Sequence, residues 1–212
     1  MLRALIFDFN GVIVESTDSN AQIYYSIFLR FGKNVAEKAV EHYKKYGGIP
    51  RQKRIEMYLR EFAGISPTHK LIEELSLEFS RMYMQSIKKA EFVPGSKEFL
   101  MNEGKIYDKF LSSGAPQDEL PEILKAVNIL QYFKEVFGAP APKSEHILTI
   151  LNKYNYAPNE VVFIGDSPKD REAALHNGIY FIARDRGLKE LADEPFKIKD
   201  LTELPNVLKL IS

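Results

Sequence analysis

Residues 2–12 read LRALIFDFNGV and are the most informative part of this chain. The first six of these residues are apolar apart from Arg3, and Asp8, Asn10 and Gly11 follow almost at once. A short apolar run that ends in polar and turn residues is typical of a strand buried on both faces of a parallel sheet. We therefore predict a strand over residues 2–7 whose carboxyl end presents Asp8.

Similar apolar runs recur along the chain, and helical patterns separate them. They predict further strands at residues 106–111, 161–164, 179–183 and 196–198, the first of which is interrupted by Asp108 and Lys109. Buried strands that alternate with helices are typical of an α/β fold. We predict a Rossmann-like parallel sheet core with helices on both faces.

Residues 19–89 carry helical spacing throughout, with breaks at Gly32, residues 47–50, Gly64 and Pro67. This segment is far longer than an ordinary connection between two strands. It therefore predicts a small inserted all-helical cap domain at residues 16–90, with the core formed by residues 1–15 and 91–212. The alternative is that these helices simply pack on the sheet.

The composition excludes several classes of protein. The 212 residues contain no cysteine, so a disulfide scaffold and a thiolate nucleophile are excluded. Lys plus Arg and Asp plus Glu balance at 29 each, which gives no overall charge to attract nucleic acid or an anionic membrane. No apolar run approaches the roughly 20 residues of a membrane span, and the amino-terminal run is too short for a secretory signal. We expect a soluble, cytoplasmic protein.

Polar residues follow the predicted strands at the points where each one ends. Asp8 follows the first, Ser112, Ser113 and Gly114 follow the second, and residues 165–170 (GDSPKD) follow the third. In open parallel sheets, ligands bind beyond the carboxyl ends of the strands. Each residue alone has a structural explanation, such as capping a helix or turn. Together with Lys143, at the start of the preceding helix, they predict one shared site.

These residues resemble the motifs of the haloacid dehalogenase superfamily. The resemblance is to its phosphatase branch with a helical cap, which includes β-phosphoglucomutase-like and phosphoglycolate phosphatase-like members. Residues 8–12 look like the nucleophile loop, and Ser113, with Ser112 the weaker choice, resembles the second motif. Lys143 resembles the third motif, and residues 165–170 are similar to the fourth. The resemblance implies hydrolysis of a small phosphorylated metabolite, with Mg²⁺ as cofactor and an aspartyl-phosphate on Asp8.

The resemblance also implies a role for each site residue. The Mg²⁺ ligands are expected to be Asp8, the backbone carbonyl of Asn10 and Asp166, since Mg²⁺ prefers oxygen ligands. Asp170 would act on the metal through water or hold Lys143 in position. The remaining assignments are that Lys143, Ser113 and Gly114 bind phosphate oxygens, while Gly11 allows a tight turn beneath the phosphate.

Asn10 departs from the family pattern, in which this position is an Asp that transfers protons. An amide cannot do so, and general acid–base catalysis contributes about 10²–10⁴-fold. We expect activated phosphate esters to be cleaved and alkyl phosphates to react slowly. Three explanations stay open: Glu15 or Asp18 supplies the proton, Asn10–Gly11 deamidates, or Asn10 is engineered. A silent phosphate- and Mg²⁺-binding protein and a phosphomutase are the alternative functions.

Residues 47–51 (GGIPR) resemble a cap loop of β-phosphoglucomutase-like relatives that reaches into the active site. Arg51 could therefore clamp a second anionic group of the substrate, because its planar fork suits phosphate and carboxylate. The alternative is a solvated arginine at the start of a helix. The four histidines show no metal-ligand spacing, and we expect them to be structural or exposed.

Overall fold

The computed structural model describes residues 1–102 and 106–211. Within these residues, six parallel strands form one sheet in the order β3-β2-β1-β4-β5-β6. Central β1 pairs with β2 on one side and with β4 on the other. The strands are β1 (Ala4–Phe7), β2 (Asp108–Pro116), β3 (Glu135–Ala139), β4 (Val161–Gly165), β5 (Tyr180–Arg184) and β6 (Lys197–Ile198).

Helices cover both faces of the sheet because the strand side chains alternate between two buried clusters. Ala4 and Ile6 of β1 belong to the cluster that includes apolar residues of α7 and α8. Leu5 and Phe7 belong to the cluster that α5, α6 and α9 complete. These helices are α5 (Ser96–Met101), α6 (Leu120–Ala126), α7 (Lys143–Tyr154), α8 (Pro168–His176) and α9 (Leu204–Ile211). The predicted α/β fold with a Rossmann-like parallel sheet is confirmed.

The strand predictions hold with small shifts, but β3 was not predicted. Its residues lie mostly half-buried at the edge of the sheet, so the strand lacks the apolar run that identified the others. The prediction for β2 placed Ser112, Ser113 and Gly114 after the strand, whereas they lie within it. The register of β2 against β3 shifts between Ser112 and Pro116, so this polar segment continues the strand only irregularly.

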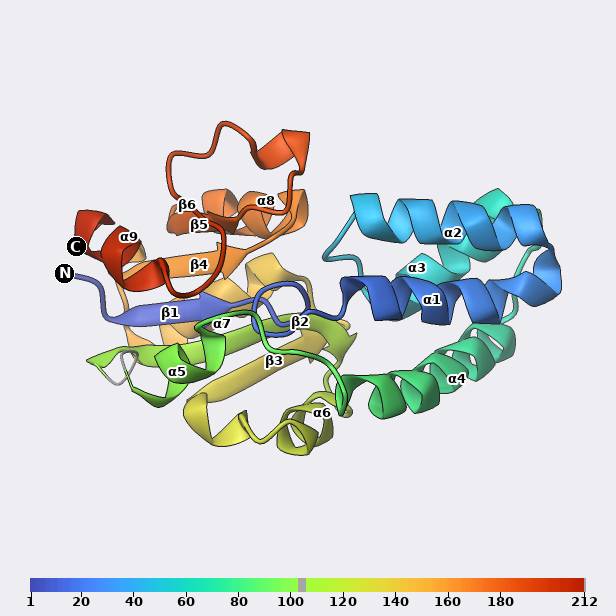
Figure 1. The fold of residues 1–212 in the computed structure, drawn as a ribbon, viewed down its shortest axis with the longest axis horizontal. Coiled ribbons are helices and arrows are strands. Elements are labelled where there is room, and N and C mark those ends of the chain that lie inside the picture. The colour runs from blue at the N-terminus through green and yellow to red at the C-terminus, as the bar shows by residue number, and fades with distance from the viewer. Residues whose placement is uncertain (103–105, 212) are drawn as a thin grey trace.

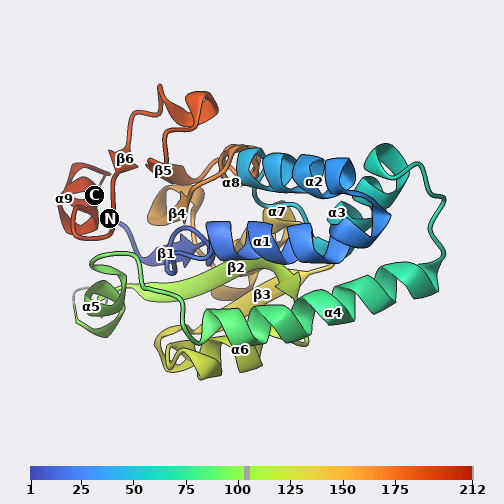
Figure 2. The same cartoon turned by 45° about the vertical axis from the view of Figure 1, so that its right-hand side comes forward.

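The segment between β1 and β2 is helical, as predicted, and most of it lies beyond the carboxyl ends of the strands (Figures 1 and 2). Its helices α1, α2 and α3 lie together and α4 runs alongside them. The chain breaks between these helices where the glycines and prolines predict. The helices are α1 (Thr17–Phe28), α2 (Lys33–Lys45), α3 (Arg51–Met57) and α4 (His69–Ile87), with a wider helical turn at Tyr58–Phe62 after α3.

The two chain crossings between the sheet and this helical segment are hydrogen-bonded to each other. The backbone N–H of Glu15 donates to the carbonyl of Glu91 at 2.8 Å, and Val14 pairs antiparallel with Phe92. These contacts support domain boundaries near residues 15 and 91, and the division into core and cap stays a prediction.

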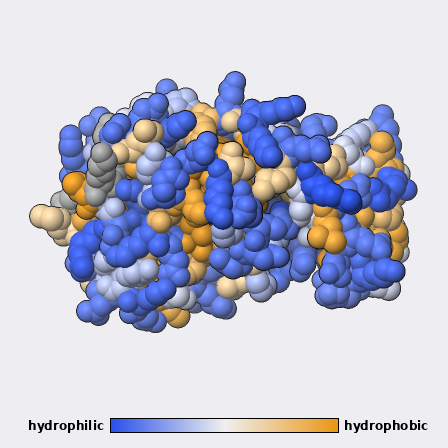
Figure 3. Space-filling model, turned by 90° about the horizontal axis from the view of Figure 1, so that it is seen from below, coloured by the Kyte–Doolittle hydropathy of each residue, from blue (hydrophilic) through white to orange (hydrophobic). Residues whose placement is uncertain are grey.

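The surface is predominantly hydrophilic on the face shown in Figure 3, where hydrophobic residues form separate patches. Across residues 1–102 and 106–211, none of the helices combines the length and apolar character needed to span a membrane.

Candidate active site

The loop after β1 holds Asp8 at the centre of the sheet edge. The Asp8 N–H donates to the carbonyl of Ile164 at 2.9 Å, which ties the loop to β4. The chain then turns back, and Gly11 N–H donates to the Val14 carbonyl at 2.7 Å. Gly11 has a φ of +80°, and a Cβ there would lie 2.2 Å from Oδ2 of Asp166. Only glycine therefore allows this turn to pack against the Asp166 carboxylate.

Asp8, Asp166 and Asp170 form a buried carboxylate cluster. One oxygen of each lies within 4.8 Å of the others. Burial raises the pKa of Asp8 to about 7, with Lys143 opposing the shift and the charges of Asp170 and Asp166 adding to it. Burial and then the charge of Asp170 also raise the pKa of Asp166. Crowded buried carboxylates of this kind are stabilised by a cation, and their hard oxygens suit a divalent ion such as Mg²⁺.

Lys143 lies at the first position of α7, as predicted, and joins two of these carboxylates. Its Nζ is 2.8 Å from Oδ1 of Asp8 and 2.5 Å from Oδ1 of Asp170. Burial acts to lower the pKa of Lys143, but the charges of Asp170 and Asp8 outweigh it and raise the pKa, so the ammonium stays charged. The other oxygen of Asp170 accepts from the Ser167 hydroxyl at 2.7 Å. These contacts favour the prediction that Asp170 holds Lys143 in position.

The two serines of β2 have different surroundings. Ser112 is fully buried, and its Oγ lies 2.8 Å from Nδ1 of His146. Ser113 lines a pocket beside Gly114 and Lys143. This arrangement favours Ser113 over Ser112 as the phosphate-binding hydroxyl, in line with the sequence prediction.

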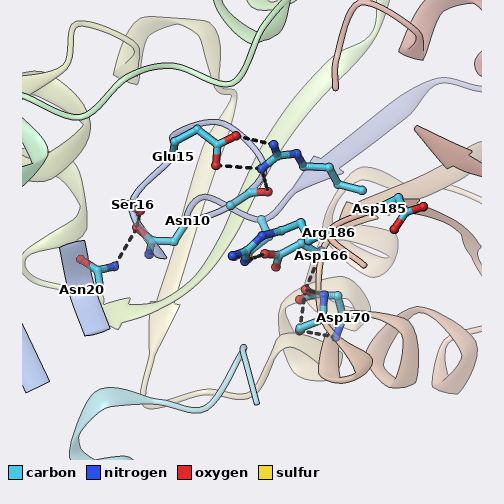
Figure 4. A network of polar contacts seen from close by, with 12 residues as sticks. Asn10, Glu15, Ser16, Asn20, Asp166, Asp170, Asp185 and Arg186 are labelled. Carbon is cyan, nitrogen blue, oxygen red and sulfur yellow. Dashed lines mark hydrogen bonds and ion pairs between the residues drawn. The ribbon is translucent and has the colours of Figure 1, made fainter. Parts of the chain in front are cut away.

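The side-chain oxygen of Asn10 accepts three hydrogen bonds. Two of the donors, the Ser16 hydroxyl at 2.6 Å and the Asn20 amide at 3.4 Å, come from residues labelled in Figure 4. The third donor is the Tyr83 hydroxyl at 2.7 Å. Ser16 and Asn20 lie at the start of α1, and Tyr83 lies on α4. The amide is therefore fixed between the strand-end loop and the helical segment.

The two acids considered as substitutes for an acid–base group at position 10 are engaged elsewhere. Glu15 forms an ion pair with Arg184, which also donates to the Gly11 carbonyl at 2.7 Å. Asp18 lies in the first turn of α1 and pairs with Lys44 at 2.7 Å. Neither lines the cavity that contains Asp8. The contacts favour structural roles for both acids.

Arg186 is a site residue that the sequence analysis missed. Its Nη1 lies 2.6 Å from Oδ2 of Asp166, and its side chain lines the same cavity as Asp8 (Figure 4). Arg186 follows β5, so the rule that polar residues after strands face the site could have identified it. Its guanidinium neutralises part of the negative charge of the carboxylate cluster.

Arg51 begins α3 as predicted, but it is buried rather than solvated, so the solvated alternative is wrong. Its Nη1 lies 2.9 Å from the carboxylate of Glu119, and it also donates to the Ser80 hydroxyl. Its guanidinium carbon lies 4.7 Å from the centre of the Phe79 ring. Arg51 lines the cavity, but Glu119 already neutralises its charge.

A cavity of about 80 Å³ lies between the strand ends and the helical segment. Asp8, Asn10 and Asp166 line it from the sheet side. The opposite wall is formed by residues of α1, α2, α3 and α4, among them Asn20 and Arg54. Of the predicted site residues, Asp8, Asn10, Arg51, Gly114 and Asp166 line this cavity, and Ser113 and Lys143 line the pocket next to it.

The structure is a parallel sheet with buried aspartates and a lysine at its strand ends, which is the arrangement that the sequence resemblance predicts, and comparison with known families identifies the class of protein. The model of the haloacid dehalogenase-like hydrolase family matches residues 5–184. The chain belongs to this family and is a hydrolase of its phosphatase branch.

Two characterised relatives are phosphatases. A phosphorylated carbohydrates phosphatase of Thermotoga maritima is 25% identical over 183 residues, which cover 84% of this chain and 82% of that protein. The validoxylamine A 7'-phosphate phosphatase of Streptomyces hygroscopicus subsp. limoneus is 23% identical and covers 96% of each chain.

Solved structures show the same fold. A β-phosphoglucomutase from Clostridium difficile superposes with a TM-score of 0.78 at 19% identity, covering 100% of this chain and 97% of that one. A predicted phosphoglycolate phosphatase from Haemophilus somnus gives a TM-score of 0.76 at 18% identity and covers 98% of both chains. At these identities the likeness establishes the fold alone.

Proposed function

We propose that this protein hydrolyses a small phosphomonoester with Mg²⁺ as cofactor, through an aspartyl-phosphate on Asp8. The observation that carries the proposal is the cluster of Asp8, Asp166 and Asp170, whose oxygens lie within 4.8 Å of one another with Lys143 against two of them. The two phosphatase relatives support a phosphorylated, carbohydrate-like metabolite as the substrate.

The donor set of the cluster fits Mg²⁺. Members of this family are generally metal-dependent, and we propose Asp8, Asp166 and the backbone carbonyl of Asn10 as ligands. The raised pKa of Asp8 reflects its burial among carboxylates, so an additional cation would favour the ionised form that can attack phosphorus. When bound, Mg²⁺ would neutralise the repulsion between this carboxylate and the phosphate dianion.

The chain's own residues then account for the transfer. An oxygen of Asp8 forms a bond to phosphorus while the bond from phosphorus to the leaving oxygen breaks. Water next attacks phosphorus, which releases inorganic phosphate and restores the Asp8 carboxylate. Lys143 and the Ser113 hydroxyl bind the non-bridging oxygens, and Asp170 keeps Lys143 in place.

Asn10 sets the range of substrates in this proposal. Its amide can hydrogen-bond the leaving oxygen but cannot give it a proton, so the leaving group must carry its own negative charge away. Esters of acidic alcohols such as p-nitrophenol tolerate this, and alkyl phosphates react slowly. A phosphomutase would need the same proton transfers, so Asn10 does not favour that alternative.

Hydrolysis of p-nitrophenyl phosphate with Mg²⁺, with and without a chelator, tests the proposal. We expect metal-dependent release of nitrophenol that Asp8→Asn abolishes. Asp193→Asn is the matched control, because it removes an exposed carboxylate outside the cavity and should leave the rate unchanged. If wild type releases no nitrophenol but still binds phosphate in a Mg²⁺-dependent way, the protein is the silent binding protein instead.

A further inference from the structure

Arg54 of α3 is a buried cation without an acidic partner. It is 1% exposed, and no carboxylate of residues 1–102 or 106–211 forms an ion pair with it. Its polar contacts are all with neutral groups: Nη2 donates to the Tyr46 carbonyl at 2.6 Å, and Nη1 lies 3.2 Å from the Tyr58 hydroxyl. Nη1 also lies 3.3 Å from Nδ1 of His42, whose pKa is lowered by burial and by the charge of Arg54. The guanidinium carbon lies 4.8 Å from the centre of the Tyr43 ring. A buried charge without a counter-charge is strongly unfavourable.

The other three cations that line the cavity are each neutralised by the protein. Arg51 pairs with Glu119 at 2.9 Å, Lys44 with Asp18 at 2.7 Å, and Arg186 with Asp166 at 2.6 Å. Arg54 differs from all of them, although it lines the same cavity as Asp8. The tyrosines around it do not supply a negative charge, because burial raises the pKa of Tyr43 to about 12 and it stays neutral.

Two buried polar atoms in this wall of the cavity are also left without hydrogen bonds. They are Nε of Arg54, a donor, and Oδ1 of Asn20, an acceptor. Both residues line the cavity, and Asn20 is 2% exposed. Its amide nitrogen donates to the Tyr43 hydroxyl at 3.1 Å, which fixes the side chain beside the ring that Arg54 covers. Buried polar atoms in native proteins nearly always have hydrogen-bond partners. These two atoms therefore indicate that a ligand with both an acceptor and a donor binds at this wall.

We infer that Arg54 binds a second anionic group of the substrate, at the end remote from the phosphate that Asp8 attacks. This inference rests on the proposed phosphatase function and narrows its substrate to an acidic phosphomonoester. A carboxylate or a second phosphate supplies the missing counter-charge and accepts from the guanidinium. A neighbouring hydroxyl on the same ligand can donate to Oδ1 of Asn20. The assignment moves the expected second-anion site from Arg51, which Glu119 neutralises, to Arg54.

Matched pairs of phosphate esters test this inference and separate the two sources of charge. Phosphoglycolate and ethyl phosphate have two carbons each and differ in a carboxylate. Glucose 1,6-bisphosphate and glucose 6-phosphate differ in a second phosphate. We expect wild type to favour the acidic member of at least one pair by about 10- to 100-fold in kcat/KM, the range of a charge-assisted hydrogen bond. Arg54→Gln should remove this preference, and Arg54→Lys should keep part of it.

Two further variants serve as comparisons. Arg60→Gln removes an exposed arginine that pairs with Glu56 outside the cavity, and it should keep the full preference. Arg51→Gln should keep the preference for the acidic ester, because its partner is Glu119. If Arg51→Gln removes the preference and Arg54→Gln retains it, the inference is overturned. It is equally overturned if wild type shows no preference in either pair.

A binding measurement distinguishes failure of this inference from failure of the proposed function. The same pairs are titrated calorimetrically with Mg²⁺ into Asp8→Asn, with and without Arg54→Gln, so the preference is measured without turnover. Hydrolysis of p-nitrophenyl phosphate without any acidic preference contradicts only the inference. An acidic preference in binding without hydrolysis by wild type contradicts only the function. If Arg54→Gln lowers thermal stability and leaves the preference intact, Arg54 serves to hold the Tyr46 carbonyl.

Discussion

Asn10 stands where the family pattern has an aspartate, but its surroundings would suit either residue. Three donors converge on its side-chain oxygen, from Ser16, Asn20 and Tyr83. An aspartate oxygen in the same place would accept the same three hydrogen bonds, and its second oxygen would take the place of the amide nitrogen. The site is therefore compatible with a carboxylate, and the substitution removes a proton-transfer group without requiring a different local structure.

The variant Asn10→Asp should therefore accelerate hydrolysis of alkyl phosphates. General acid–base catalysis contributes about 10²–10⁴-fold, and the full effect requires a poor leaving group. We expect the rate with ethyl phosphate to rise within that range and the rate with p-nitrophenyl phosphate to rise much less. Steady-state kinetics on both esters measures the difference. Equal rates of wild type and variant on ethyl phosphate would show that proton transfer at position 10 does not limit this enzyme.

Arg186 should compete with the metal ion for Asp166. Its guanidinium contacts the carboxylate oxygen at 2.6 Å and places a positive charge beside the proposed ion site. Arg186→Gln removes both effects, and we expect the dissociation constant for Mg²⁺ or Mn²⁺ to fall about 10-fold. Titration followed by calorimetry, or by the electron paramagnetic resonance of free Mn²⁺, measures this without turnover. Arg171→Gln, which removes an exposed arginine paired with Glu194, is the control. An unchanged affinity in Arg186→Gln would contradict competition.

Among the elements, α7 connects the site to the sheet through Lys143 and His146. The contacts of His146 define its neutral form: Nε2 lies 3.1 Å from the Gly138 carbonyl, which can only accept, and Nδ1 faces the Ser112 hydroxyl. Burial lowers the pKa of His146 to about 4, and the charge of Lys143 contributes. The histidine is thus structural, as the sequence analysis expected, and it holds α7 against β2 and β3.

The burial of His146 makes the stability of the protein depend on pH. The unfolded chain protonates His146 near pH 6.5 and the folded chain only near pH 4, so the unfolded state binds more protons between these values. The free energy of unfolding should therefore fall as the pH drops from about 6.5 to 4, by about 3 kcal/mol from this group. Urea unfolding of wild type and His146→Gln across this range measures the difference in slope. Parallel pH profiles of the two proteins would contradict it.

How far the sequence predicts these elements depends on how each is buried. β1 and β4 lie inside the sheet and are apolar on both faces, so their positions were predicted to within two residues. The edge strand β3 has no such run and was missed. Asp8 and Asp166 were predicted because strand topology brings them to one edge, and Lys143 because it begins the helix before β4 and resembles a family motif. The partners of Arg51, Arg54 and Arg186 depend on how distant segments pack, which no local pattern encodes.

At the scale of the whole molecule, the helical segment closes over the sheet edge. The Arg51–Glu119 pair joins α3 to the residue just before α6, and the loop at Gly47 and Gly48 packs on Ser167 and Lys169 of the core. The cavity that Asp8 lines is about 80 Å³, and the pocket next to it, which Ser113 and Lys143 line, is about 500 Å³. Gly48 and Ile49 of this loop line both spaces, so the position in which the loop rests on the core shapes the site.

A larger side chain at position 47 should prevent the loop from resting on the core. A Cβ at Gly47 would lie 2.8 Å from Cβ of Ser167, and Gly47 is not among the positive-φ glycines, so its backbone accepts other residues. Gly47→Val should separate the loop from the core and lower kcat/KM for p-nitrophenyl phosphate by about 10²-fold, because displacements of about 1 Å near reacting groups have effects of this size. Gly47→Ala should fall between wild type and Gly47→Val.

Small-angle scattering should show a larger radius of gyration for Gly47→Val, while the midpoint of thermal unfolding changes little because the loop contact buries few apolar side chains. Wild-type kinetics and an unchanged radius in Gly47→Val would mean that catalysis does not require the loop to rest on Ser167.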